Sequence, residues 1–294
     1  MKFSPKTSLN NALHSAWIII KLIVPIYIIA DVLFYYEVLQ KISFIFTPLT
    51  TILDLPPEAA LSILSGMLLN LYAAIAFAAP LDLDARQWSI LGVFLGICHA
   101  LIVETAIMKQ LGIPKSFSVL LRFCVGLFIG WITTCLPHSF FKGKINIEQT
   151  SSITIKHYDS LKALLENSIV EALTLTTEVI ILITFIIFIM DFIKSLSFIE
   201  SYSQKVNSAF SLGTGVILGI TYGAGVLINE YKNASLSTKD IWFVGTFLMI
   251  CHAIIEDSLL FVIFGANLWV IVLLRVIFAT IFAFIIANAI TKKT

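Results

Sequence analysis

The sequence predicts an all-α protein that crosses a lipid bilayer several times and consists of two related halves. Hydrophobic residues make up 59% of its 294 residues and charged residues only 13%, whereas a soluble domain is roughly 45–50% apolar. Apolar runs of about 20 residues recur, long enough to cross a hydrocarbon layer as a helix. The run Cys98–Glu104 (CHALIVE) returns almost unchanged as Cys251–Asp257 (CHAIIED).

The first half, residues 1–137, is expected to hold long spans and one short segment. Residues 40–55 are apolar but too short for a comfortable span, and Pro48 interrupts them, so we expect a re-entrant or broken helix there. The next helix begins at Pro56-Pro57-Glu58, with proline and an acid in its first turn. The expected longer helices are Leu13–Leu39, Pro57–Pro80, Trp88–Met108 and Phe117–Leu136.

A polar connector, residues 138–165, separates this half from the second, residues 166–294. In the second half, residues 194–208 are short and mixed and match 40–55. The expected helices there are Ser168–Ile193, Ala209–Asn229, Ile241–Phe264 and Leu268–Ile290. An offset of 153 residues relates both the repeated histidines and the arginines that follow them, which indicates an internal duplication, a common plan in transporters.

Matching turns of the two halves carry opposite charge biases. Lys109 and Lys115 follow the first histidine-bearing span, whereas Lys232 and Lys239 precede the second. Because lysine and arginine prefer cytoplasmic flanks, this pattern favours inverted halves, each with an odd number of crossings. Parallel halves with four crossings each are the alternative, and both arrangements place both termini in the cytoplasm.

Ionisable side chains lie where hydrocarbon is expected, so they are candidates for a solute or ion path. The helical rise puts Glu104 level with Arg122 on adjacent antiparallel helices, and Asp257 level with Arg275. Each arginine is therefore expected to pair with its acid, either as a structural staple or as part of a site. The candidate path residues are His99, Glu104, Arg122, His252, Glu256, Asp257, Arg275 and Asn70.

The histidines are close enough to acids on one helix face to share a ligand or a proton. His252 and Glu256 are four residues apart, whereas His99 has only Glu104, five residues on. Two cysteine–histidine pairs, Cys98-His99 and Cys251-His252, are weak candidates for a metal site between the halves. Neighbouring residues on a helix point about 100° apart, so one pair does not easily bind one ion. A buried histidine satisfied by its neighbours is the alternative.

These residues resemble the nucleoside recognition, or Gate-domain, family of membrane proteins. The resemblance rests on the run from Leu55 to Gly66, the helix that ends at Pro80, and the histidine-to-acid motifs with a trailing arginine. The family includes spore maturation proteins A and B, and Gate domains occur in the ferrous iron transport protein B and the concentrative nucleoside transporters. The resemblance implies an inner-membrane protein with two inverted Gate-like repeats and a solute path between them. The chain lacks a GTPase domain and is short for a nucleoside transporter.

We therefore expect a secondary transporter for a small polar or ionic solute, with the coupling proton carried by the histidine and acid pairs. A membrane scaffold that binds a partner protein is the alternative. An intramembrane enzyme is a third and less favoured possibility, because no nucleophile motif and no His-Glu-x-x-His is present. We expect no cofactor. The expected partners are the bilayer, a small solute and a second copy of the chain, and the net charge of +1 gives no reason to expect nucleic acid.

Overall fold

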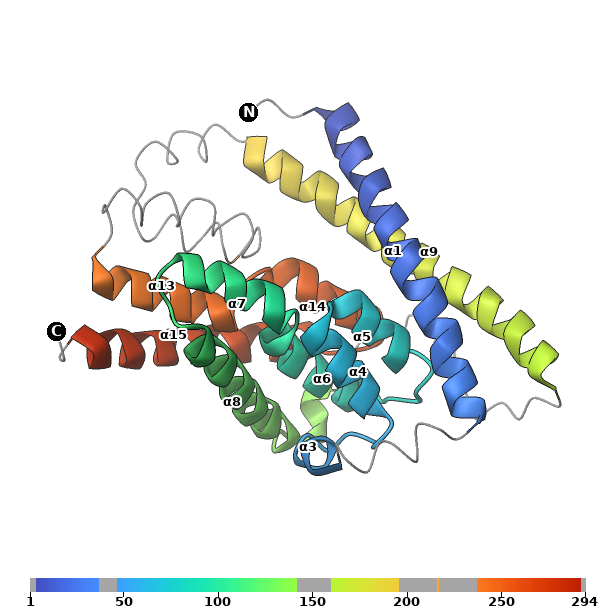
Figure 1. Cartoon of the computed structure of the whole chain (residues 1–294), viewed down its shortest axis with the longest axis horizontal. Coiled ribbons are helices and arrows are strands. Elements are labelled where there is room, and N and C mark those ends of the chain that lie inside the picture. Colours follow the sequence, from blue (N-terminus) through green and yellow to red (C-terminus); the bar gives the residue numbers. More distant parts are fainter. Residues whose placement is uncertain (1–3, 37–46, 142–159, 196–215, 217–236, 292–294) are drawn as a thin grey trace.

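The computed structural model describes residues 4–36, 47–141, 160–195, 216 and 237–291 (Figure 1), and every regular element there is a helix. Six of its helical segments are long and apolar enough to cross a membrane. The protein is thus the predicted all-α polytopic membrane protein. Its elements are α1 (Pro5–Tyr35), α3 (Thr47–Ile52), α4 (Ala59–Leu68), α5 (Leu71–Ala78), α6 (Ala85–Cys98), α7 (Leu101–Gln110), α8 (Lys115–Thr134), the 3-10 helix η2 (His138–Phe141), α9 (Leu161–Ser195), α13 (Thr238–Ile250), α14 (Ile254–Val262) and α15 (Leu268–Thr291).

α1, the first long helix of the first half, packs against α9, the first long helix of the second half. This pair lies along one side of the bundle (Figure 1). The Ser8 hydroxyl donates to Asp191 Oδ2 at 2.8 Å, and the Ser168 hydroxyl donates to Asp31 Oδ2 at 2.5 Å. An early residue of α1 thus meets a late residue of α9, and the reverse, so the helices are antiparallel. Ser8 matches Ser168, and Asp31 matches Asp191, at an offset of 160 residues. The two contacts are therefore equivalent under exchange of the helices.

The predicted helix from Pro57 to Pro80 is instead a hairpin of two short helices, α4 and α5. The chain turns at Leu69 and Asn70, and the Ser62 hydroxyl of α4 donates to the Ala74 carbonyl of α5 at 2.8 Å. With 10 residues, α4 rises only about 15 Å, half of a hydrocarbon layer. The expectation of one long helix was wrong because the Asn70 side chain accepts from the Ala73 N–H and so begins a new helix.

The two histidine-bearing spans are also interrupted, where the sequence predicted continuous helices. The first divides into α6 and α7 at His99-Ala100, and the second into α13 and α14 between Cys251 and Ala253. Ala100 and Ala253 adopt left-handed backbone conformations, with φ of 45° and 43°. This conformation is unfavourable by roughly 1–2 kcal/mol for a residue with a Cβ atom. The local preference of alanine therefore gave no indication of a break.

Matching elements of the two halves begin at the same offset of 153 residues. Asp84 caps α6 and Ser237 caps α13, each in a reciprocal capping box with the residue three positions on. The pairs α7 and α14, and α8 and α15, keep the same spacing. The agreement between the halves therefore extends from sequence motifs to helix boundaries, while duplication and inversion stay predictions.

Other expected boundaries agree with the structure only in part. α9 begins at Leu161, inside the predicted connector 138–165, and α3 covers residues 47–52 of the short segment 40–55. The predicted segment 194–208, apart from its first two residues at the end of α9, and the predicted helix 209–229, apart from Val216, lie outside the described residues.

Replacing either left-handed alanine by glycine should keep or raise stability. Glycine adopts positive φ without a steric penalty, so Ala100→Gly and Ala253→Gly should stabilise the folded protein by up to about 1 kcal/mol. Ala76→Gly, in the middle of α5, is the control and should destabilise it by about 1 kcal/mol. Thermal unfolding of the purified protein in detergent measures all three. Equal losses in all three variants would contradict the assigned backbone conformation.

Candidate functional site

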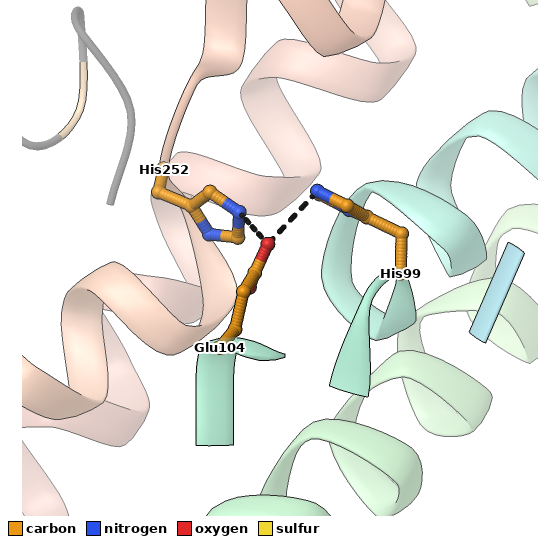
Figure 2. Close-up of side chains that lie close together, drawn as sticks. All are labelled: His99, Glu104 and His252. Carbon is orange, nitrogen blue, oxygen red and sulfur yellow. Dashed lines mark hydrogen bonds and ion pairs between the residues drawn. The ribbon is translucent and has the colours of Figure 1, made fainter. Parts of the chain in front are cut away.

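The two interrupted helices bring His99 and His252 face to face in the interior. Their ring centroids are 5.1 Å apart, and the exposed fractions of the residues are 8% and 1%. Figure 2 shows both rings pointing toward the carboxylate of Glu104. The sequence predicted a polar centre between the halves, and the structure brings these three side chains together there.

A backbone carbonyl fixes the orientation of each ring. His99 Nδ1 lies 2.9 Å from the Leu95 carbonyl oxygen, and His252 Nδ1 lies 2.8 Å from the Leu248 carbonyl oxygen. A carbonyl oxygen can only accept, so Nδ1 carries a proton in both rings. Nε2 is therefore the nitrogen that each neutral ring presents to the centre with a lone pair.

Glu104, in the first turn of α7, is the carboxylate that both rings share. Its Oε1 lies 3.0 Å from His99 Nε2 and 3.1 Å from His252 Nε2. Its Oε2 lies 2.8 Å from Arg122 Nη2. One buried carboxylate from the first half thus joins both histidines to an arginine. The helix-face argument that assigned Glu256 to His252 was wrong, because the helix is broken between them.

Arg122 and Arg275 are both fully buried, and each binds the carbonyls that a helix break leaves without a partner. Arg122 Nε donates to the Ile97 carbonyl at 2.6 Å, and Nη2 donates to the His99 carbonyl at 2.7 Å. Arg275 repeats this with Ile250 at 3.2 Å and His252 at 2.8 Å. Among the described residues, Nη1 of each arginine has no hydrogen-bond partner. A positive group is also favourable at the C-terminal end of a helix.

Asp257 occupies the position that matches Glu104 but has a different role. Its Oδ2 lies 3.4 Å from Arg275 Nη2, so the second predicted arginine–acid pair is present. The aspartate side chain is one methylene shorter than glutamate. The two pairs thus have the same plan, while the carboxylate between the rings belongs to Glu104 alone.

Two glycines, Gly66 and Gly96, allow close contacts at this centre. The sequence alone did not predict these contacts. The Gly66 carbonyl at the end of α4 accepts from the Ala100 N–H at 2.9 Å, which ties the α4–α5 hairpin to the first break. A Cβ atom at Gly96 would lie 2.9 Å from Arg275 Nη1, so any larger residue there would require the guanidinium to shift. Gly92 and Gly96 are four residues apart, a spacing of small residues that indicates close helix packing but does not identify the partner.

The remaining predicted site residues lie around this cluster. Asn70 caps α5, a structural role. Glu256 Oε1 accepts from the Tyr72 hydroxyl at 3.4 Å, a contact between α14 and α5 that the sequence did not indicate. Cys98 Sγ donates to the Arg122 carbonyl at 3.1 Å, and Cys251 is buried.

The candidate set of metal-binding side chains differs from the predicted one. Among the described residues, His99, Glu104 and His252 place one ligand atom each within 4.8 Å of one another. The sequence had named the two histidines together with Cys98 and Cys251. This group includes the two histidines and not the cysteines, and its third donor, Glu104, comes from the helix after the break.

The fold and this centre define the class of protein: an all-α polytopic membrane protein with a polar cluster buried where helices are interrupted. The chain is similar to a protein of Bacillus subtilis (strain 168) with the name Uncharacterized membrane protein YvoD. The two are 28% identical over 288 residues, which cover 94% of this chain and 91% of that protein. No family model matches the chain, and no solved structure does.

Arg122→Met should destabilise the protein strongly, because it leaves Glu104 and two carbonyls buried without their cation. The expected loss is about 3–5 kcal/mol. Arg122→Lys should recover only part of it, since a single ammonium group cannot reproduce the planar guanidinium. Lys115→Met, on the exposed start of the same helix, is the control and should change stability by less than about 0.5 kcal/mol. Thermal unfolding in detergent is the measurement, and a neutral Arg122→Met would refute the capping role.

Proposed function

We propose that the protein is a secondary transporter that moves a small polar or ionic solute across the inner membrane through the site between His99, Glu104 and His252. The observation that carries the proposal is the pair of helix breaks that face one buried carboxylate. Irregular backbone inside a membrane is tolerated where it is enclosed by protein or lines a cavity, and transporters build their sites from such broken helices.

Helix ends give this site its electrostatic character. α6 and α13 end one and two residues before the two histidines. α7 and α14 begin with Glu104 and Asp257 in their first turns. Carbonyl ends carry partial negative charge, and here Arg122 and Arg275 each bind two of these carbonyls. In known transporters, half-helix carbonyl ends coordinate cations. The α4–α5 hairpin adds a third interrupted segment at the same place, through the contact of Gly66 with Ala100.

The antiparallel pair of α1 and α9 supports an inverted relation between the halves. Reciprocal contacts between matching residues, Ser8 with Asp191 and Ser168 with Asp31, imply a two-fold axis perpendicular to both helices. For helices that cross a membrane, such an axis lies near the membrane plane. Within the described residues each half contributes three of the six long apolar segments, the odd number that inversion requires. Both termini would then lie in the cytoplasm.

The scaffold alternative rests on the same arginines, which hold the breaks together whether or not a solute passes. The scaffold and the carrier differ in the role of the histidines. A scaffold needs only that the rings pack, whereas a carrier needs their Nε2 atoms to meet the solute. Proton coupling through the histidines and Glu104 also stays a prediction.

Flux through proteoliposomes should depend on the two histidines. Uptake of labelled divalent cations, nucleosides and organic anions would first identify a transported solute. His99→Ala and His252→Ala should then reduce its initial uptake rate by at least about 100-fold, a loss typical of a group that meets the solute directly. His138→Ala, on the exposed 3-10 helix, is the matched control and should keep the wild-type rate.

Three results would count against the carrier. One is flux that both histidine variants leave unchanged. Another is the absence of flux for every solute in the panel. The third is co-purification of a stoichiometric protein partner without any flux, which would favour the scaffold.

A further inference from the structure

We propose that His99, Glu104 and His252 form a binding site for one divalent transition-metal ion of borderline softness, such as Zn²⁺. The binding site follows from the geometry alone. The additional step, that the ion is the solute carried, rests on the proposed function.

The hydrogen bonds of the two rings carry the inference. With Nδ1 held as a donor to the Leu95 and Leu248 carbonyls, each neutral ring directs its Nε2 lone pair at Glu104 Oε1, which also has only lone pairs. With both rings neutral, three acceptor atoms therefore converge, with nitrogen–oxygen separations of 3.0 and 3.1 Å. A single proton can join only two of them, whereas a metal ion can accept electron pairs from all three.

The separations suit a small ion. Zinc binds histidine nitrogen at about 2.0–2.1 Å and carboxylate oxygen at about 2.0–2.2 Å. Tetrahedral bonds of that length separate the donor atoms by about 3.4 Å. The two nitrogen–oxygen distances here, 3.0 and 3.1 Å, need to widen by only a few tenths of an ångström. The two ring nitrogens lie within 4.8 Å of each other, and small movements of the rings would bring them to the tetrahedral separation.

The surrounding contacts are those that orient metal ligands in known sites. Histidine ligands usually donate their other N–H to a carbonyl, and ligand carboxylates are themselves held by a second group. Both histidines here donate to carbonyls, and Arg122 contacts the Glu104 oxygen that faces away from the rings. The orientation of all three side chains is thus fixed before an ion arrives.

The donor set also selects among ions. Two imidazole nitrogens and one carboxylate oxygen suit Zn²⁺, Fe²⁺, Co²⁺ or Mn²⁺ better than Ca²⁺ or Mg²⁺, which prefer oxygen alone. Copper(I) prefers thiolates, and the Cys98 thiol instead contacts the Arg122 carbonyl. Three protein ligands leave a coordination position for water or an exchanging ligand. Arg122 already balances the charge of Glu104, so we expect affinity low enough for release.

Metal binding to the purified full-length protein in detergent tests the site without any flux. Calorimetric titration with Zn²⁺ should give one ion per chain, and Co²⁺ should give the visible absorption of a four-coordinate nitrogen and oxygen site. His99→Gln, His252→Gln and Glu104→Gln should each weaken Zn²⁺ binding by at least about 100-fold. The amide of Glu104→Gln can still meet Arg122, so this variant is the least disruptive to the fold. His138→Gln is the control for binding at surface histidines and should bind as the wild type does.

X-ray absorption at the zinc edge of the wild-type protein keeps the proposal testable where a variant does not fold. It should show two imidazole nitrogens and at least one oxygen around the ion. Sulfur ligands, no stoichiometric binding, or equal binding by the folded site variants would each overturn the metal site. Metal binding without flux would reject the transporter but support the metal site. Flux of another solute without metal binding would support the transporter but reject the metal site.

Discussion

The constraint on which this structure depends is that a helix interrupted inside a membrane must satisfy its free carbonyls without water. Arg122 and Arg275 meet it, each by binding two carbonyls at the end of a broken helix and one acid at the start of the next. Every charge introduced is therefore balanced within the same break. The cost of burying an ion pair is repaid only with such additional hydrogen bonds.

The breaks then place the histidines. Each histidine lies next to the end of a helix segment, where its ring can donate to the carbonyl four residues earlier. In the first half, the left-handed Ala100 that follows reverses the chain enough to bring Glu104 beside the His99 ring. Stability and site geometry thus come from the same few residues, which explains why their strain is retained.

The sequence predicted the membrane class, most long helices and the two arginine–acid pairs, because apolar length and helical rise determine these directly. It did not predict the breaks. Ala100 and Ala253 carry no turn signal, and their conformation is stabilised by tertiary contacts such as the Gly66 carbonyl. For the same reason it assigned His252 to Glu256, since spacing along one helix cannot predict a partner that lies 148 residues away in the chain.

The difference between Glu104 and Asp257 explains how two matching halves form one site rather than two. Each acid begins the second segment of its broken helix and meets its own arginine. Two glutamates reaching the same pair of rings would bring two negative charges together in a buried space, and like charges at such a distance cannot both stay ionised. With aspartate at one position, a single carboxylate oxygen lies between the two rings, and the site has one centre located between the halves.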